Sequence, residues 1–380
     1  QRIINNYQYE GLKMSRRLLF VLNSLAGGGA EKVFINLINN LDKSKYIIDV
    51  LLMENHGVYL HALPSHVNVI FMKDQHNDIV NLPFCDDEVK KLYDLNIKEN
   101  YDVEIAFIEG PATKFIANST NANSKKYAWI HTDLPMHHYT KYIFKSDEDE
   151  ELHYLKFDKI FCVSTGATQS VARLFPKIQD KLETLTNNID IPEVMEKANR
   201  FDVIYKKLTF IVVARLHFGK GHLRLLKAIN ALLNLGYDFN LEIFGIGDME
   251  GEIIKFIYDN KLNNNVHLHG FAYNPYPYIK SANLLILTSF AEGYSTVMSE
   301  AMILGTPVAG TEIVGLMDVM GNGEFGYLLG NTDKSIFNRL KFILDNKNML
   351  EELKTKAELG AKRFGIDITL SDYEKYFMEE

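Results

Sequence analysis

Residues 289–307 read SFAEGYSTVMSEAMILGTP and follow an apolar run, ANLLIL, at 282–287. An apolar run before a glycine-bearing loop is typical of a buried strand that turns into a helix, and we expect Ser295 to cap that helix. Such turns at the carboxyl ends of parallel strands line a crevice, and the free N–H groups of a helix N-terminus favour an anionic or hydroxyl-rich ligand. The segment therefore predicts a ligand site with two carboxylates, Glu292 in the loop and Glu300 on the helix. The alternative for Glu300 is a carboxylate that is paired inside the protein.

Outward from this segment, apolar strands and amphipathic helices alternate along almost the whole chain, which predicts α/β architecture with parallel sheets. A polar stretch interrupts the alternation. We predict two Rossmann-like, doubly wound domains that face a central cleft, one over 14–190 and one over 207–368, with a linker at 191–206. A last amphipathic helix, 369–380, is expected to cross back to the first domain. Residues 1–13 are polar and are interpreted as a leader or upstream extension.

The composition narrows the class of protein. The chain has 380 residues, 47% of them hydrophobic and 24% charged, and its net charge is −8. This excess of acidic over basic residues argues against a nucleic-acid partner, because binding phosphates would need many Lys and Arg side chains. Two isolated cysteines exclude a disulfide framework and fit a reducing compartment, so we expect a cytoplasmic protein. No apolar run reaches the roughly 18 residues of a spanning helix.

Two cations follow the first strand of the second predicted domain. In ARLHFGKG, residues 214–221, Arg215 lies at the strand end and Lys220 near the next helix. A guanidinium fork and a mobile ammonium together suit a diphosphate. The alternative is that Arg215 ties down a loop and Lys220 is simply solvated.

The first domain offers weaker signals. Gly28 and Gly29, in GGGAE at 27–31, follow the first strand and open a helix, so a ligand could approach the bare backbone there. A tight turn is the alternative, and the segment lacks the dinucleotide fingerprint G-x-G-x-x-G. His131 ends the strand KYAWIH and is expected to point into the same cleft from the opposite wall.

Two further segments complete the set of candidates. Gly245 and Gly247 follow another second-domain strand and are expected to form a tight turn that lines the crevice. The stretch 139–145 carries aromatic and basic residues. An ordinary loop is the favoured interpretation for that stretch, and docking of an acceptor or a membrane surface is the alternative. No residues show metal-ligand spacing, so we predict no metal site.

Taken together, GGAE at 28–31, the strand-end His131, ARLxxxKG at 214–221 and EGYSTVMSEAMILGTPV at 292–308 resemble the retaining glycosyltransferases of family 4, within the glycosyl transferases group 1. The resemblance extends from residue 16 to the end of the chain. It implies the GT-B architecture of two Rossmann-like domains. It also implies a nucleotide-sugar donor that binds mainly to the second domain.

The resemblance assigns roles to the candidate residues. It implies that Arg215 and Lys220 hold the diphosphate, that Glu300 binds the ribose and that Glu292 contacts the transferred sugar. Backbone N–H groups of Gly293, Tyr294 and Ser295 would meet sugar or phosphate. His131 would contact the sugar from the first domain, and Gly28 and Gly29 would line the acceptor and phosphate side.

The expected activity is transfer of a hexosyl or N-acetylhexosaminyl group, with a UDP-sugar favoured as donor, to a glycan or lipid-linked glycan. Because Arg215 and Lys220 would stabilise the departing diphosphate, we expect a metal-independent reaction with no cofactor besides the nucleotide sugar as co-substrate. Peripheral association with the inner face of the membrane is an accompanying expectation. The alternatives are a nucleotide-sugar epimerase of related fold and a non-catalytic sugar-nucleotide-binding partner subunit.

Overall fold

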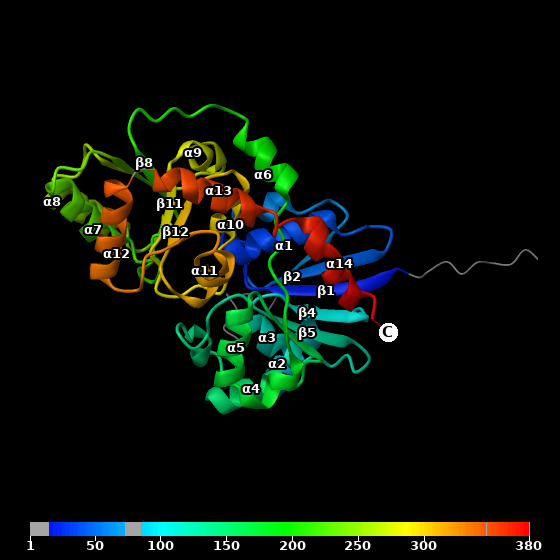
Figure 1. The fold of residues 1–380 in the computed structure, drawn as a ribbon. Coiled ribbons are helices and arrows are strands. Elements are labelled where there is room, and N and C mark those ends of the chain that lie inside the picture. The colour runs from blue at the N-terminus through cyan, green and yellow to red at the C-terminus, as the bar shows by residue number, and fades with distance from the viewer. Residues whose placement is uncertain (1–14, 73–84, 347, 380) are drawn as a thin grey trace, which may run out of the picture.

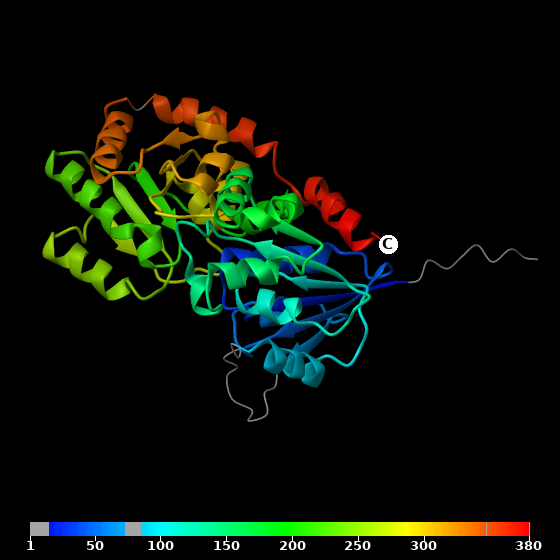
Figure 2. The same ribbon diagram turned by 90° about the horizontal axis from the view of Figure 1, so that it is seen from below.

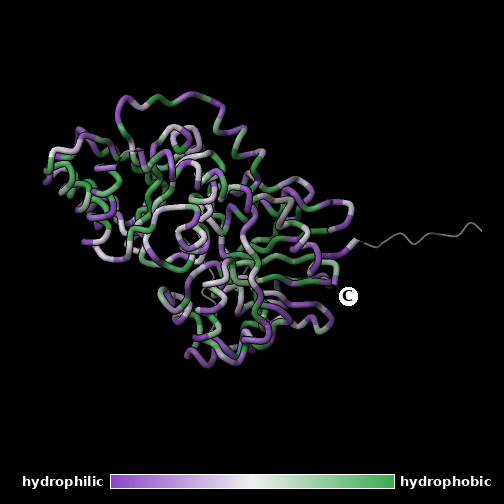
Figure 3. The backbone as a smooth tube through the Cα atoms, in the orientation of Figure 1, coloured by the Kyte–Doolittle hydropathy of each residue, from purple (hydrophilic) through white to green (hydrophobic). Residues whose placement is uncertain are grey.

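The computed structural model describes residues 15–72, 85–346 and 348–379, which form two α/β domains (Figure 1). The predicted leader, 1–13, lies outside the described residues. In each domain all the paired strands run parallel, as the alternation of strands and helices predicts. Figure 3 shows hydrophobic strands inside each domain and more hydrophilic segments toward the outside.

The first domain is built on a seven-stranded sheet in the order β3-β2-β1-β4-β5-β6-β7. Its strands are β1 (Arg16–Leu22), β2 (Tyr46–Leu52), β3 (Asn68–Phe71), β4 (Val103–Ala106), β5 (Lys125–Ile130), β6 (Lys159–Cys162) and β7 (Leu182–Thr184). Its helices are α1 (Gly29–Asn40), α2 (Asp86–Asn96), α3 (Pro111–Ala117), α4 (Asp147–Tyr154) and α5 (Thr165–Leu174). Alternate residues of β1 enter two different cores, Phe20 on one face of the sheet and Leu19 on the other. The sheet is therefore covered on both faces, which explains why its strands are apolar runs.

The second domain contains a six-stranded sheet in the order β10-β9-β8-β11-β12-β13. Its strands are β8 (Thr209–Val213), β9 (Asn240–Phe244), β10 (Val266–Leu268), β11 (Leu284–Leu287), β12 (Val308–Gly310) and β13 (Tyr327–Leu328). Its helices are α7 (His222–Asn234), α8 (Glu250–Asp259), α9 (Tyr276–Ser281), α10 (Thr296–Ile303), α11 (Val314–Val319), α12 (Asp333–Asp345) and α13 (Met349–Ala361). Figure 2 shows this domain and the first side by side.

Two segments outside the sheets connect the domains. The stretch expected as a linker begins with a helix, α6 (Ile191–Ala198), because Asp190 caps it through the Glu193 N–H at 2.9 Å and Pro192 suits a first turn. Val194 of this helix belongs to the second core. At the other end of the chain, α14 (Ile366–Phe377) lies against the first domain (Figure 1), where Tyr373 stacks on Trp129 at a centroid distance of 5.6 Å.

Three short helices, α3, α9 and α11, were not anticipated from the sequence. Each has six or seven residues. In α3 every residue after Pro111 is buried, so no apolar stripe repeats with helical period. Such segments cannot be distinguished from short strands or loops by periodicity.

The strand order positions the site. In both sheets the order reverses between two neighbouring central strands, β1 and β4 in the first domain and β8 and β11 in the second. A doubly wound sheet binds ligands at the carboxyl edge where its order reverses. The loops after β1, β8 and β11 carry the glycine segment, the Arg215 segment and the Glu292 segment, respectively.

Candidate active site

The two cations and Glu292 come from adjacent strands of the second sheet. Strand β8 pairs with β11, and Arg215 and Glu292 lie in the loops that follow them. Lys220 ends a single 3₁₀ turn, Phe218–Lys220, just before α7. Its Nζ lies 2.6 Å from Oε1 of Glu292, and the Ser289 hydroxyl donates to the same oxygen at 2.8 Å. The structure thus brings together the predicted leaving-group cation and the predicted sugar-binding carboxylate.

Glu300 is buried on α10, and its carboxylate is paired across the domains. Lys32 of α1 contacts Oε1 of Glu300 and the Tyr276 hydroxyl, and that hydroxyl donates to the same carboxylate oxygen at 3.1 Å. An apolar helix that carries a carboxylate needs such a partner. Sequence reasoning anticipated the need for a partner and missed both Lys32 and Tyr276.

The start of α1 also approaches Arg215. Gly28 is the N-cap of α1, and a Cβ there would lie 2.3 Å from Oε2 of Glu31 and 2.9 Å from Nη2 of Arg215. Burial raises the pKa of Glu31, and the positive charge of Arg215 opposes this rise. A Cβ on Gly29 would be 3.5 Å from the Thr296 hydroxyl. The glycines therefore allow the first domain to approach the second at the predicted phosphate site.

Gly293, Tyr294 and Ser295 bring the domains together at the start of α10. A Cβ on Gly293 would lie only 2.2 Å from the carbonyl oxygen of His131, so a bare backbone is required at this contact. The Tyr294 ring packs against both cores, and burial raises its pKa to about 12. Ser295 caps α10 by accepting the Met298 N–H at 3.4 Å, as the sequence predicted.

His131 follows β5, and its ring is tilted by 43° against that of Phe107, with 5.1 Å between the ring centroids. Its Nε2 donates to the Phe107 carbonyl at 2.9 Å, which leaves Nδ1 as an acceptor with no hydrogen-bond partner among the described residues. Burial lowers the pKa of His131 to about 4. The imidazole is therefore neutral at physiological pH and suited to accept a hydroxyl proton in a hydrogen bond.

A buried carboxylate that sequence reasoning missed supports this histidine. Oε2 of Glu109 accepts the His131 backbone N–H at 2.9 Å, and burial raises the Glu109 pKa. The Tyr139 hydroxyl is also bonded to Glu109. The aromatic and basic stretch 139–145 is thus anchored to the His131 loop through Tyr139, while Tyr142 in the same stretch is exposed.

Gly245 and Gly247 lie directly beside the Arg215 loop. A Cβ on Gly245, whose φ is +145°, would be 1.9 Å from the Ala214 carbonyl oxygen. A Cβ on Gly247 would be 2.3 Å from that of Leu216. Hydrogen bonds from the Ala214 N–H to Phe244 and from the Leu216 N–H to Ile246 join the two loops. Both glycines therefore allow the segment after β9 to pack closely against the backbone on either side of Arg215.

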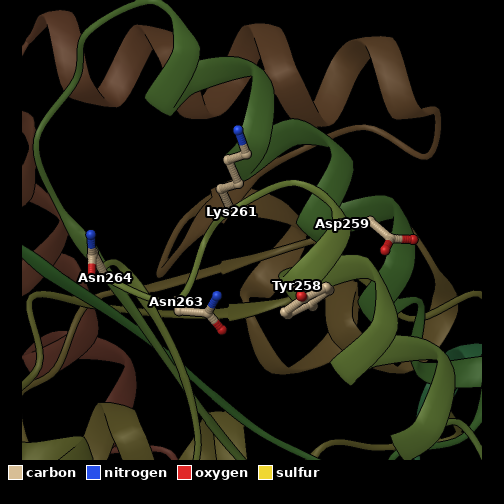
Figure 4. A pocket seen from close by; sticks show the side chains of 5 residues that line it. All are labelled: Tyr258, Asp259, Lys261, Asn263 and Asn264. Carbon is tan, nitrogen blue, oxygen red and sulfur yellow. The ribbon is translucent and has the colours of Figure 1, made fainter.

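The hollows on the described surface include two of similar size. The larger, about 480 Å³, lies at the end of α8 and contains no predicted site residue (Figure 4). Its five side chains point in different directions: Tyr258, Asp259, Lys261, Asn263 and Asn264. The second hollow, about 390 Å³, lies between the domains beside the His131 loop. Among the described residues, no helix has the length and apolarity needed to cross a bilayer, and no group of three or more His, Cys, Asp or Glu side chains is arranged to hold a metal ion.

Comparison with known proteins identifies a matching family model and several relatives. Residues 195–359 match the model of the family described as glycosyl transferases group 1. An N-acetylgalactosamine-N,N'-diacetylbacillosaminyl-diphospho-undecaprenol 4-alpha-N-acetylgalactosaminyltransferase of Campylobacter jejuni is 29% identical over 96% of this chain and 100% of its own length. A second Campylobacter jejuni protein is 23% identical over 96% of this chain and 98% of its own length, and is named as an alpha-1,4-N-acetyl-D-galactosaminyltransferase.

Solved structures show the same fold. Anabaena HepE in complex with UDP and glucose superposes with a TM-score of 0.77 at 18% identity, over 96% of this chain and all of that chain. A mutant of Staphylococcus aureus TarM in complex with fondaparinux, alpha-GlcNAc-glycerol and UDP gives a TM-score of 0.76 at 15% identity, over 96% and 100% of the two chains. The chain therefore has the predicted GT-B fold of two Rossmann-like domains.

Proposed function

We propose that this chain, whose residues 195–359 match the model of the glycosyl transferases group 1, transfers a hexosyl or N-acetylhexosaminyl group from a UDP-sugar to a glycan or lipid-linked glycan. The observation that carries the proposal is the convergence of Lys220 and Glu292, 2.6 Å apart, in the loops beyond two adjacent central strands. Arg215 lies in the loop after β8, the strand that pairs with β11. The cations Arg215 and Lys220 are suited to bind a diphosphate, and the Glu292 carboxylate beside Lys220 is suited to accept hydrogen bonds from sugar hydroxyls.

In the proposed chemistry the bond between the anomeric carbon and the diphosphate breaks as that carbon gains positive charge, an acceptor hydroxyl bonds to the carbon from the same face, and the departing phosphate oxygen takes the hydroxyl proton. Arg215 and Lys220 stabilise the negative charge that develops on the leaving phosphate, together with the N–H groups at the start of α10. Glu300 accepts hydrogen bonds from the ribose. Glu292 accepts them from the transferred sugar, while His131, held by Phe107 at 2.9 Å, contacts the sugar from the first domain.

Retention of configuration and independence from metals are part of the proposal. Several relatives are named for alpha linkages, and transfer from an alpha-linked nucleotide sugar into such a linkage retains the configuration. Arg215 and Lys220 supply the positive charge that a metal ion supplies in other sugar transferases. No cofactor beyond the nucleotide sugar enters this scheme, and EDTA is expected to leave the rate unchanged.

The proposed acceptor and location follow the names of the relatives. Two of them act on sugars attached to diphospho-undecaprenol, which supports a lipid-linked glycan as acceptor. The enzyme is proposed to be cytoplasmic and to associate peripherally with the inner face of the membrane. The net charge of −8 supports the absence of a nucleic-acid partner.

The test is turnover of a panel of UDP-sugars with and without a diphospho-undecaprenol-linked glycan, followed by mass spectrometry of products. Transfer to the acceptor with release of UDP is the expected result. A donor isomer formed without acceptor would identify an epimerase instead. Binding of UDP without turnover of any donor would identify a binding subunit.

A further inference from the structure

The hollow of about 390 Å³ between the domains is lined by both polar and apolar residues. Asp133, Ser170 and Arg173 supply the polar side chains. The apolar lining consists of Pro135, Met136, Leu174 and Val314. Val314 comes from the second domain and the other lining residues from the first. The volume lies within the range of small-molecule sites.

Asp133 has an unmet hydrogen-bonding capacity. It is only 2% exposed, and its Oδ1 is buried with no hydrogen-bond partner among the described residues. Burial raises the pKa of this carboxyl group, and the Ser170 hydroxyl and the Arg173 charge oppose the rise. A buried carboxylate oxygen without a donor is costly to the folded protein. Such a cost in the wall of a pocket points to a ligand that brings the missing donor.

The position of the pocket connects it to the proposed transfer site. Asp133 lies two residues beyond His131, whose carbonyl oxygen contacts Gly293. Val314 immediately precedes Gly315, whose N–H donates to the Glu292 carbonyl at 3.1 Å. The hollow therefore adjoins the loop that carries the proposed sugar-binding carboxylate.

We propose that this pocket binds the terminal sugar of the acceptor, with Asp133 accepting a hydroxyl hydrogen bond and Arg173 donating one. A pyranose has hydroxyl donors at its rim and C–H groups on its faces, and the pocket offers both polar and aliphatic side chains to meet them. Arg173 is exposed, and its guanidinium reaches the Ser170 hydroxyl at 3.4 Å, so it can turn toward a ligand. The assignment of this sugar to the acceptor rests on the proposed glycosyltransferase function.

The test is saturation-transfer NMR of the full chain, with UDP present, against the methyl glycosides of N-acetylgalactosamine, N-acetylglucosamine, galactose and glucose. At least one glycoside is expected to bind. Asp133→Asn and Arg173→Gln are each expected to weaken its Kd by about tenfold, as expected for loss of a charge-assisted hydrogen bond. Asp259→Asn, in the hollow at the end of α8, is the matched control and is expected to leave the Kd unchanged.

Stability separates recognition from a structural role. Because Asp133→Asn removes the charge of a buried carboxylate whose Oδ1 has no partner among the described residues, its Tm is expected to equal or exceed that of the wild type while glycoside binding falls. A Tm that falls together with binding would overturn the assignment of Asp133. Arg173→Gln, at an exposed position, tests the pocket without disturbing the core.

Failure of the pocket and failure of the transferase proposal give different results. No binding of any of the four glycosides, or equal Kd values in the wild type and both variants, would overturn the pocket. UDP titration of the same samples reports on the donor site, and its Kd is expected to be equal in the wild type and both variants. Glycoside binding without UDP binding would contradict the transferase proposal and leave a sugar-binding pocket.

Discussion

Lys32 in the first domain forms an ion pair with Glu300 in the second, across 268 residues of sequence. The Glu300 side chain is 6% exposed and that of Lys32 is 21% exposed. Tyr276 contacts both groups, and the Lys32 ammonium also lies 4.7 Å from the centre of its ring. The carboxylate proposed to bind the ribose is therefore held by a cation from the opposite domain.

Lys32→Met is expected to lower the free energy of unfolding by about 1–3 kcal/mol, because it leaves the buried Glu300 carboxylate with the neutral Tyr276 hydroxyl, and without its cation. Urea unfolding measures the change. Lys45→Met is the matched control, since Lys45 pairs with Glu374 at 3.3 Å on the surface and its loss is expected to cost less than about 1 kcal/mol. Equal losses in the two variants would contradict the importance assigned to the Lys32 pair.

Lys220→Ala is expected to lower kcat/KM for transfer by about tenfold or more, because the ammonium is proposed to stabilise the leaving diphosphate. Steady-state kinetics with saturating acceptor measure the effect. Lys227→Ala provides the control, since Lys227 lies on α7, the helix that follows Lys220, with a side chain 61% exposed. Unchanged donor hydrolysis and transfer in Lys220→Ala would show that this residue does not touch the leaving group.

Gly293→Ala is expected to destabilise the protein by about 1–3 kcal/mol, because the added methyl would meet the His131 carbonyl oxygen at 2.2 Å. Thermal unfolding measures it, and activity is expected to fall as well because the contact joins the two domains. Gly251→Ala on α8 is the opposite case, since nothing lies within 4 Å of the new Cβ. That variant is expected to gain up to about 1 kcal/mol from helix propensity. A neutral Gly293→Ala would mean that the domains separate readily at this point.

Acidification is expected to destabilise the protein through two buried histidines. Burial lowers the pKa values of His131 and His222 to about 4, whereas an unfolded histidine titrates near 6.5. The unfolded chain therefore binds more protons between about pH 6.5 and pH 4, and stability falls as the pH falls through that window. Above pH 6.5 both forms are neutral and this contribution is fully present.

Urea unfolding of His222→Leu between pH 7 and pH 4.5 tests this dependence. Both ring nitrogens of His222 are buried without hydrogen-bond partners among the described residues, so an apolar replacement removes a titrating group and no bond. The slope of the free energy of unfolding against pH is expected to become shallower, by the equivalent of up to about one bound proton. His61→Gln, at an exposed position, is expected to keep the wild-type slope. Identical slopes in all three proteins would refute the role of His222.

Local chemistry explains which features were predictable from the sequence. Apolar runs marked the strands, and Ser295 marked the start of α10, because both signals depend on neighbouring residues. The sequence placed Lys220 and Glu292 in strand-end loops of the second domain, whereas their pairing depends on the adjacency of β8 and β11 in the sheet. The helix at the start of the expected linker was missed because its capping signal, Asp190 with Pro192, lies inside an otherwise polar stretch.

Long-range contacts account for the rest. In the sequence, Lys32 looks like an ordinary surface residue of an amphipathic helix. Its role depends on Glu300 of the second domain, which lies beside it only in the folded structure. Glu109 gave no local signal either, because its importance comes from the His131 backbone, 22 residues away. Asp133 became notable only when burial left its Oδ1 without a donor. Such roles depend on the relative placement of strands and domains, which hydrophobic periodicity does not specify.

The most direct test of the central claim is calorimetric titration of UDP into the wild type, Lys220→Ala and Lys227→Ala. The wild type and Lys227→Ala are expected to bind UDP with equal affinity, and Lys220→Ala at least about tenfold more weakly, which corresponds to about 1.4 kcal/mol. Absence of UDP binding to the wild type, or equal affinity in all three proteins, would contradict a diphosphate site at Lys220.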